Sequence, residues 1–247
     1  ISENKQLQQQ LIESEKMSAV GKLTAGVAHE FNNILAIIYG KSSLIEMLAK
    51  EMNNIELQEF AQSITQTVNR GKSIVLSMMS FAKPAPPQKK SYNICSLYAE
   101  VIALQEKNLQ LENIEIIKNC CKNPPEIFVD KIQIEQVFLN IVLNARHAIL
   151  PKGQGRIETG CRVNNDFVEF YIKDDGIGIP EKDMRRIFEP FFTTKGAYAK
   201  NNIGLKGTGL GLCVSKSIIN NHGGEIMVES KEGEGATFKI ILPISKK

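Results

Sequence analysis

Two glycine-rich loops in the C-terminal half of the chain carry residues suited to binding phosphate. Residues 174–180 read Asp-Asp-Gly-Ile-Gly-Ile-Pro, and residues 207–212 read Gly-Thr-Gly-Leu-Gly-Leu. Glycine lets backbone N–H groups approach phosphate oxygens closely. The second loop leads directly into an apolar periodic stretch, so its amides are expected at a helix N-terminus, which favours anions. The two loops together predict a site for the phosphates of a nucleotide.

A stretch rich in carboxamides precedes these loops. Gln136, Asn140 and Asn144 follow one another at four-residue intervals with apolar residues between them, and such positions share one face of a helix. A polar face is usually only solvated, but two asparagines in so apolar a stretch need partners. Their side-chain oxygens suit Mg²⁺, which bridges protein to phosphate. Neither loop matches the phosphate loop ending in Gly-Lys-Ser/Thr or the dinucleotide fingerprint, so those nucleotide folds are disfavoured.

Two further segments extend this series of motifs. Residues 188–195 read Phe-Glu-Pro-Phe-Phe-Thr-Thr-Lys, and residues 27–33 read Val-Ala-His-Glu-Phe-Asn-Asn. The order and spacing of all five segments resemble the H, N, G1, F and G2 boxes of bacterial sensor histidine kinases of two-component systems. The resemblance spans nearly all of the chain.

The resemblance implies an ATP site with Mg²⁺ in the C-terminal half. Asp174 is expected to accept a hydrogen bond from the adenine amino group, with Thr237 closing the same pocket. Asn144 is the expected Mg²⁺ ligand, and Asn140 is expected beside the phosphates. Lys195 is the candidate cation for the γ-phosphate. The remaining nucleotide-binding residues are expected in the two loops: Gly176, Gly178, Gly207, Thr208, Gly209, Leu210 and Gly211.

The N-terminal third has the apolar periodicity of a helical bundle. Alternating three- and four-residue steps run from Met17 to Leu48 and again from Leu57 to Phe81, with a polar break at residues 51–54. This pattern predicts two helices joined as a hairpin. Further apolar residues beside each seam widen the stripe beyond what one partner helix covers, which predicts a homodimer with a four-helix bundle. These flanking residues are Leu23, Leu35, Ile37 and Leu44 on the first helix and Ala61, Val68 and Val75 on the second.

The same register bears on His29, the phosphoacceptor that the resemblance implies. With Val27 and Phe31 on the seam, His29 falls at an outward position, and we expect an exposed imidazole. The adjacent Glu30 offers a carboxylate that fixes the tautomer of the attacking ring. Asn33 stands where relatives with phosphatase activity carry Asn or Thr, so dephosphorylation of the regulator is a further expectation. The resemblance also implies transfer from His29 to an Asp of a response-regulator receiver domain.

The proline-rich segment 84–91 ends the second helix and is interpreted as a hinge. It separates a dimerisation and phosphotransfer hairpin at 1–83 from a catalytic ATP-binding domain at 92–247. Periodicity and capping signals in that domain predict helices near 94–102 and 130–149, and strands at 114–117, 156–163, 166–172, 225–229 and 236–242. The fold class is therefore α+β, with an α/β sandwich that resembles the ATP-binding domain of gyrases and histidine kinases.

Composition limits the partners. The 247 residues carry a net charge of +3 and no basic footprint, so no nucleic-acid partner is expected. No run of eighteen apolar residues occurs, and a membrane is expected only through segments upstream of this portion. The five cysteines show no metal-ligand spacing, and the adjacent pair Cys120 and Cys121 is interpreted as packing or surface. Their odd number and scatter favour a reducing, cytoplasmic compartment.

Two other classes of protein stay open at this point. A gyrase-like ATPase would hydrolyse ATP with a glutamate one turn before its Mg²⁺ asparagine, where this chain has Asn140, which cannot act as a base. A signalling scaffold would dimerise and bind nucleotide without transferring phosphate. Label from γ-labelled ATP on His29 distinguishes the kinase from both.

Overall fold

The computed structural model of the chain describes residues 30–82, 87–121, 124–194 and 209–244. Two compact units, Ile1–Ala85 and Pro86–Lys247, make up the chain, and the division between them falls within the segment predicted as a hinge. Four predicted site residues lie outside the described residues: His29, Lys195, Gly207 and Thr208.

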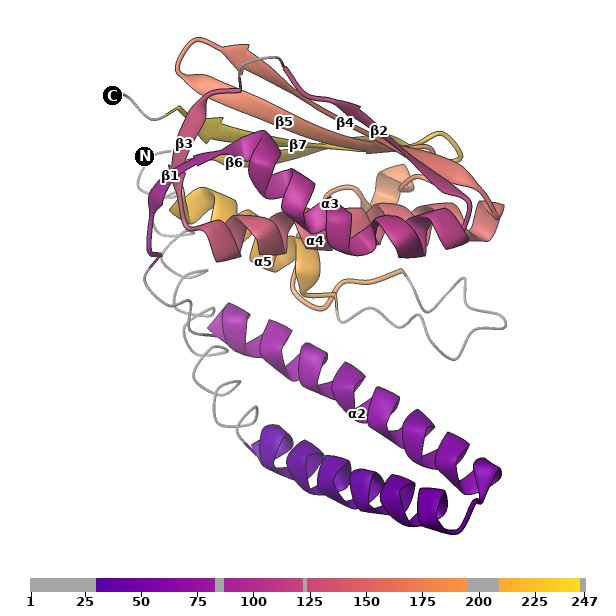
Figure 1. Cartoon of the computed structure of the whole chain (residues 1–247). Coiled ribbons are helices and arrows are strands. Elements are labelled where there is room, and N and C mark those ends of the chain that lie inside the picture. Colours follow the sequence, from indigo (N-terminus) through magenta and orange to yellow (C-terminus); the bar gives the residue numbers. More distant parts are fainter. Residues whose placement is uncertain (1–29, 83–86, 122–123, 195–208, 245–247) are drawn as a thin grey trace. The chain divides into compact units, whose positions relative to one another are not determined.

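The described part of the N-terminal unit is a helical hairpin (Figure 1). Residues 30–51 form the first helix and Ile55–Ala82 form α2. In the turn between them Asn53 adopts a left-handed conformation with φ of 50°, which asparagine tolerates better than most residues. The side-chain oxygen of Asn54 accepts a hydrogen bond from Leu57 N at 3.0 Å and caps α2. The polar break in the sequence is therefore the turn of the hairpin.

The two helices meet along a stripe that includes four of the residues predicted beside the seam: Leu35, Ala61, Val68 and Val75. Ile37 and Leu44, also predicted there, are 61% and 56% exposed, because they lie on the opposite flank of the seam. On the first helix Ser42 and Ala49 are buried, and Ser42 Oγ donates to the carbonyl oxygen of Ala61 at 2.6 Å. Leu35 lies one heptad before Ser42, and its Cδ2 would be 3.1 Å from a Cβ added at Gly71. The facing buried positions of α2 also recur every seven residues: Ala61, Val68 and Val75.

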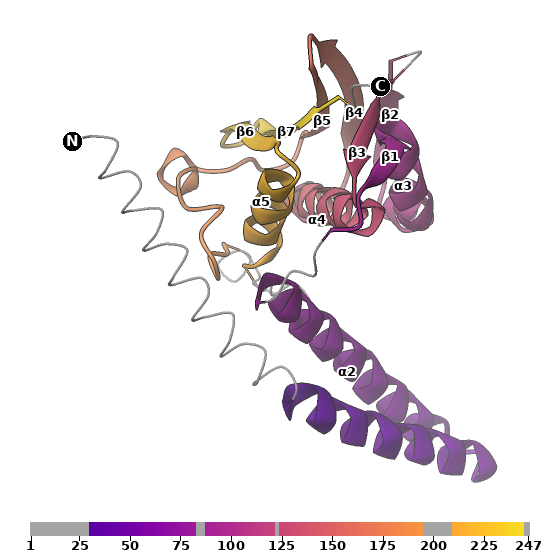
Figure 2. The same cartoon turned by 90° about the vertical axis from the view of Figure 1, so that its left-hand side faces the viewer.

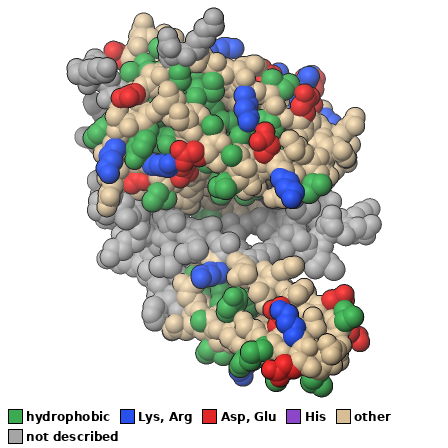
Figure 3. All heavy atoms as spheres, in the orientation of Figure 1, with side chains coloured by type: hydrophobic (Ala, Val, Ile, Leu, Met, Phe, Trp, Pro, Cys, Tyr) green, Lys and Arg blue, Asp and Glu red, His purple; other side chains and the backbone are tan. Residues whose placement is uncertain are grey.

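Most of the predicted seam is exposed in the described hairpin, whereas Ile45 and Leu57 are half-buried. The exposed fractions of Phe31, Ile34 and Phe60 are 52%, 53% and 58%. Hydrophobic side chains accordingly reach the surface of this unit in Figure 3. The sequence register is therefore corrected: the flanking stripe, not the predicted seam, forms the contact between the two helices of the hairpin. Two adjacent stripes of each helix are apolar, and residue spacing alone does not tell which of them makes that contact. We call the outer stripe the open seam; it comprises Phe31, Ile34, Ile38, Leu48, Phe60 and Ile64.

The C-terminal unit is a two-layer α/β sandwich, and the predicted fold class is confirmed (Figures 1 and 2). Its sheet has the order β2-β4-β5-β7-β6, with β2 parallel to β4 and the other neighbours antiparallel. The strands are β2 (Ile114–Asn119), β4 (Gly155–Asn164), β5 (Phe167–Asp174), β6 (Glu225–Lys231) and β7 (Gly235–Pro243). One face is covered by α3 (Ile94–Leu111), α4 (Lys131–Ile149) and α5 (Gly211–Asn221).

Two short strands and two 3₁₀ turns were not predicted. The strands β1 (Lys90–Asn93) and β3 (Glu126–Val129) pair antiparallel, and a bridge joins Ile127 to Ile244 after β7. Strands of four residues hold too few positions for alternation to be recognised. Because β1 begins at Lys90, the last two residues of the predicted hinge belong to the sheet layer instead. The 3₁₀ turns are η1 (Leu150–Lys152) and η2 (Glu181–Asp183).

The core lies between the helices and the sheet. Three aromatic rings meet there, Tyr98 from α3, Phe138 from α4 and Phe170 from β5, with centroids 5.0 to 5.5 Å apart. Pairs at this spacing add about 0.5–1.5 kcal/mol beyond the burial of their area. The predicted cap of α4 is confirmed, since Asp130 Oδ1 accepts from Gln133 N at 3.2 Å. These contacts fix α4 on the sheet.

His222 ties the end of α5 to the start of α4. Its ring is buried, with Nδ1 2.8 Å from the Ile218 carbonyl oxygen, and Nε2 accepts a hydrogen bond from Asp130 N at 3.0 Å. A ring that donates through Nδ1 and accepts through Nε2 is neutral. Burial is the main reason that the pKa of His222 is lowered.

We expect the substitution His222→Phe to lower the free energy of unfolding by about 1–3 kcal/mol, because Asp130 N–H is left buried without an acceptor. The lowered pKa means that the stability His222 confers is fully present above pH ~6.5 and is lost as the pH falls through its folded value. Urea unfolding of both proteins at several pH values measures this. A difference in free energy of unfolding between wild type and His222→Phe that stays constant from pH ~7.5 to ~5 would contradict the prediction.

Candidate functional site

Asp174 places a buried carboxylate at the end of β5. It is 3% exposed and lies opposite Ile157 of β4 and Ala236 of β7. Its Oδ1 accepts from Gly176 N at 2.9 Å. Burial raises the pKa of Asp174 to about 6, and hydrogen bonds from the backbone of Gly176 and Ala236 oppose that rise. Among the described residues no cation forms an ion pair with this carboxylate. A buried acid of this kind suits a neutral donor, such as an amino group on a ring.

The glycines of the first loop are required by packing against other parts of the protein. A Cβ at Gly176 would lie 2.6 Å from Ala148 of α4, and one at Gly178, whose φ is +69°, would lie 2.1 Å from the Lys231 carbonyl oxygen. Between them, Ile177 N donates to the Ala148 carbonyl at 3.0 Å. The loop is therefore held between the end of α4 and the turn after β6. Packing alone accounts for these two glycines, which the sequence had assigned to phosphate approach.

Asn140 and Asn144 lie one turn apart on α4, and both are half-buried. The Nδ2 atom of Asn140 donates to the Gly211 carbonyl at 3.2 Å and to Ser215 Oγ at 3.3 Å. These two hydrogen bonds orient the side-chain amide, so that its nitrogen points to the start of α5 and its oxygen is the atom that can bind a ligand. The predicted polar face of α4 thus meets the predicted phosphate loop.

The second loop ends at the N-terminus of α5, where Leu210 occupies the N-cap position without a side-chain cap. Gly209 has φ of +69°, and a Cβ there would lie 2.3 Å from the backbone of Phe191. Gly211 is different, because a Cβ there would meet only the Asn140 side chain at an ordinary 3.5 Å. Helix N-terminal amides that no side chain caps are a ready site for an anion.

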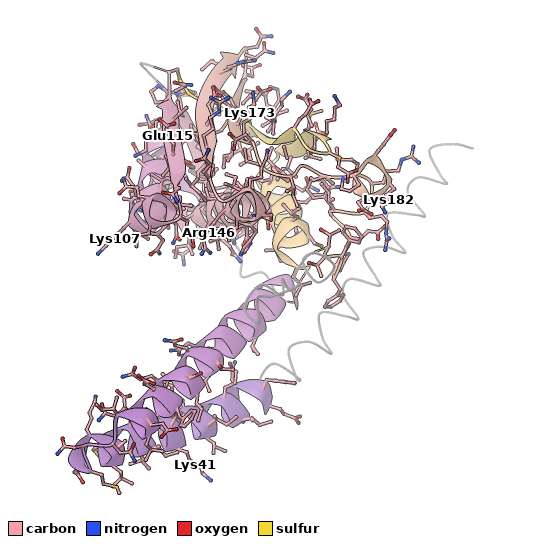
Figure 4. All side chains as sticks on the ribbon, turned by 90° about the vertical axis from the view of Figure 1, so that its right-hand side faces the viewer. Lys41, Lys107, Glu115, Arg146, Lys173 and Lys182 are labelled. Carbon is pink, nitrogen blue, oxygen red and sulfur yellow. A yellow bond between two sulfur atoms is a disulfide. The ribbon has the colours of Figure 1, made fainter. Side chains whose placement is uncertain are left out.

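Thr237 does not share a face with Asp174. In β7 it is Ala236 that pairs with Asp174, whereas Thr237 pairs with Lys173 and with Glu229 of β6. Successive side chains of a strand point to opposite faces, so Thr237 lies on the face away from the helices, with Lys173, which Figure 4 labels. The prediction that Thr237 closes the adenine pocket is wrong. The position opposite the buried carboxylate is Ala236.

The structure thus brings Asp174, Gly176 and Gly178 to one end of α4, and Asn140 to the start of α5 with Leu210 and Gly211. Glu30 and Asn33 lie in the N-terminal unit, on the helix of residues 30–51, and both are exposed.

Two supporting residues were missed by sequence reasoning. Ser215 accepts from Asn140 and donates to the Gly211 carbonyl at 2.9 Å, a four-residue step in α5 that the sequence could have indicated. Lys152 donates from Nζ to the carbonyls of Asp175 and Gly176. Nothing in the sequence marks Lys152, because more than twenty residues separate it from the loop that it holds.

Comparison with known proteins agrees with this geometry. Residues 129–246 match the family described as histidine kinase-, DNA gyrase B-, and HSP90-like ATPase, and residues 19–86 match the His Kinase A (phospho-acceptor) domain. Sporulation kinase E of Bacillus subtilis (strain 168) is 34% identical over 244 residues, covering 99% of this chain and 31% of its own length. The chain therefore spans about a third of that relative.

Solved structures agree as well. ShkA, solved in complex with AMPPNP, superposes with a TM-score of 0.75 at 23% identity, covering 92% of this chain and 46% of that one. The histidine kinase ThkA, solved in complex with the response regulator protein TrrA, has a TM-score of 0.65 at 27% identity, covering 99% of this chain and 68% of that one.

The fold and the site define a gyrase-type ATPase domain preceded by a phospho-acceptor hairpin. The chain belongs to the sensor histidine kinases of bacterial two-component systems. Within the residues that the structure describes, no helix combines the length and the apolar character that crossing a membrane requires.

The substitution Asp174→Asn is expected to stabilise the nucleotide-free protein at neutral pH. A pKa raised from 3.8 to about 6 means that the carboxyl group favours the fold fully below pH 3.8, and this contribution is lost as the pH rises through 6. At about 1.4 kcal/mol per pKa unit, ionisation costs the fold roughly 3 kcal/mol above that window. Urea unfolding at pH ~4 and pH ~7.5 should show the gain of the variant only at the higher pH.

The same variant is expected to bind ATP at least about tenfold more weakly, because an amide oxygen is a poorer acceptor than a carboxylate. Asp183→Asn, in the 3₁₀ turn η2, is the matched control and should bind ATP normally. Calorimetric titration measures both affinities. Equal affinity of Asp174→Asn and wild type would show that the carboxylate does not contact the nucleotide.

The substitution Gly211→Ala is expected to weaken ATP binding without lowering the stability of the protein. The added methyl group has room in the nucleotide-free protein, and alanine in a helix is about 0.5–1 kcal/mol better than glycine, so the melting temperature should hold or rise. ATP affinity should fall, since the methyl group stands beside the amides that a phosphate would use. Gly209→Ala is the contrast, because its positive φ and contact with Phe191 predict lost stability. Unchanged ATP affinity of folded Gly211→Ala would place the phosphates elsewhere.

Proposed function

We propose that this chain transfers the γ-phosphoryl group of ATP to His29 and then to an aspartate of a response-regulator receiver domain. The observation that carries the proposal is the buried carboxylate of Asp174, which has the placement needed to read the amino group of adenine. A similar structure was solved in complex with AMPPNP, which supports ATP as the phosphoryl donor. Another was solved in complex with a response regulator protein, which supports transfer to a receiver domain.

The residues around α4 fit an adenine nucleotide with Mg²⁺. Asp174 would accept from the adenine amino group, and the N-terminal amides of α5 would hold the phosphate chain. The oxygen of Asn144 would ligate Mg²⁺, and Asn140, oriented by its two bonds to α5, would direct its oxygen toward the same region. Mg²⁺, when bound, neutralises charge on the phosphate oxygens. Lys195 is proposed to do the same at the γ-phosphate.

His29 is proposed to attack as a neutral imidazole. A nitrogen–phosphorus bond forms while the bond from the γ-phosphorus to the bridging oxygen breaks, so ADP leaves and phosphohistidine remains. Glu30 would hold the ring tautomer through the other nitrogen. Such a reaction depends on in-line positioning and charge neutralisation more than on covalent chemistry by the protein. Its product then gives the phosphoryl group to the receiver aspartate.

The open seam supports a homodimer of the hairpin. Its exposed apolar residues follow the helix repeat beside the intrachain contact, as a four-helix bundle made from two copies requires. Asn33 is exposed on the first helix, one turn after His29, where it could orient a water molecule on the phosphorylated receiver. We propose phosphatase activity on that ground.

Hydrolysis of ATP is the second candidate, and Asn140 disfavours it. A hydrolase of this fold needs a base at that position, and an amide whose nitrogen already donates to α5 cannot accept a proton from water.

Incubation with γ-labelled ATP and Mg²⁺ tests the proposal. We expect acid-labile label on the wild type and a loss of more than about 100-fold on His29→Gln, since the nucleophile is gone. Asn33→Ala is the matched control, which should keep autophosphorylation and slow the dephosphorylation of a phosphorylated receiver domain. Free phosphate as the sole product would instead support the ATPase, and neither product would support the scaffold.

A further inference from the structure

Four of the five cysteines gather at one place in the C-terminal unit. Cys95 lies in the first turn of α3, Cys120 and Cys121 follow β2, and Cys161 lies on β4. The Sγ atoms of Cys95, Cys120 and Cys161 lie within 4.8 Å of one another, and Cys121 forms a disulfide with Cys161 (sulfur in yellow in Figure 4).

Strand register explains the gathering. The last pair between β2 and β4 joins Asn119 to Gly160, so the residues that follow β2 come to lie beside Cys161. The sequence interpretation of scattered cysteines is wrong, and Cys121 is a disulfide partner instead of a packing or surface residue, whereas Cys120 is exposed as that interpretation allows. Chain separations of 25 and 40 residues hide a cluster that parallel pairing creates.

The sulfur atoms of Cys95, Cys120 and Cys161 lie close enough together for a thiolate metal site, and Cys121, which is bonded to Cys161 here, can supply a fourth ligand once the disulfide is reduced. Zinc–sulfur bonds of about 2.3 Å place the sulfurs of such a site roughly 3.8 Å apart. Here the Sγ atoms of Cys95 and Cys161 are 3.6 Å apart. Cys121 N also donates to Cys161 Sγ at 3.2 Å, and hydrogen bonds of this type support metal-bound thiolates.

The proposed function predicts that these cysteines are reduced in the cell, and the inference rests on the proposed function for that point alone. A kinase that consumes ATP works where thiols are kept reduced. A dithiol reductant there would give two electrons and two protons to the Cys121–Cys161 disulfide, leaving two thiols and the oxidised reductant.

We propose that reduced Cys95, Cys120, Cys121 and Cys161 bind one soft divalent cation, with Zn²⁺ as the expected metal. Binding forms four metal–sulfur bonds and releases four protons. The site fastens the first turn of α3 to the edge of the sheet formed by β2 and β4. It is thus a structural metal site, distinct from the Mg²⁺ site proposed on α4.

The test uses the 247-residue chain, reduced and then freed of reductant under anaerobic conditions. Co²⁺ alone is the probe, because tetrahedral thiolate coordination gives it a charge-transfer band and intense visible bands. We expect one equivalent of Co²⁺ to bind and Zn²⁺ to displace it. Cys120→Ser, at an exposed position that the fold tolerates, should weaken Co²⁺ binding by more than about 100-fold, since losing even an outer-shell partner costs about 10–100-fold.

Cys213→Ser is the matched control, because Cys213 is buried in α5 outside the cluster, and it should bind Co²⁺ as the wild type does. Circular dichroism establishes that each variant is folded, and Cys95→Ser replaces Cys120→Ser if the latter is not. A reduced wild type that binds no Co²⁺, a disulfide that survives reduction, or full affinity in a folded variant of the cluster would overturn the proposal. ATP binding measured on the same samples reports on the proposed function separately.

Discussion

The buried carboxylate of Asp174 is the constraint on which the rest of the catalytic domain depends. An acid that is 3% exposed, and that burial drives to a pKa of about 6, opposes folding at neutral pH. Hydrogen bonds from the backbone of Gly176 and Ala236 offset part of this cost. A ligand that donates a further hydrogen bond to the buried carboxylate would offset the rest of this cost. Such a ligand would therefore stabilise the folded domain.

Strand pairing and close packing around Asp174 fix the positions of the neighbouring strands and of the loop that follows β5. The sheet register sets Asp174 between Ile157 and Ala236, and the loop that follows is pressed between Ala148 and the turn after β6. Because α4 contributes Ala148 at one end and Asn140 two turns earlier, a single helix contacts both the first glycine loop and the start of α5. A rigid helix positions such groups more precisely than a loop does.

Sequence reasoning succeeded where the determining interaction is local. The cap of α4 joins Asp130 to Gln133, three residues away, and alternation along β5 and β7 shows within each strand which side faces the core. It failed where the interaction joins distant segments. Whether Thr237 faces Asp174 depends on the register of β7 against β5. The open seam and its flank both have helical spacing, so the spacing does not tell which of them forms the hairpin contact. The cysteine cluster depends on the register of β2 against β4, which no local pattern shows.

Asn140 determines which chemical groups the polar face of α4 offers next to α5. Its amide nitrogen donates to the Gly211 carbonyl, and a glutamate there would set a carboxylate against that carbonyl oxygen instead. The position is therefore built for an amide, which orients α5 and holds no proton-accepting group for water. A domain with this arrangement can bind and polarise ATP but lacks the base for hydrolysis at that point. Under the proposed function the nucleophile is supplied from elsewhere in the protein, by His29, which precedes Glu30 in the sequence. Under the proposed function, an amide in place of a base therefore leaves the site dependent on an acceptor outside the catalytic domain.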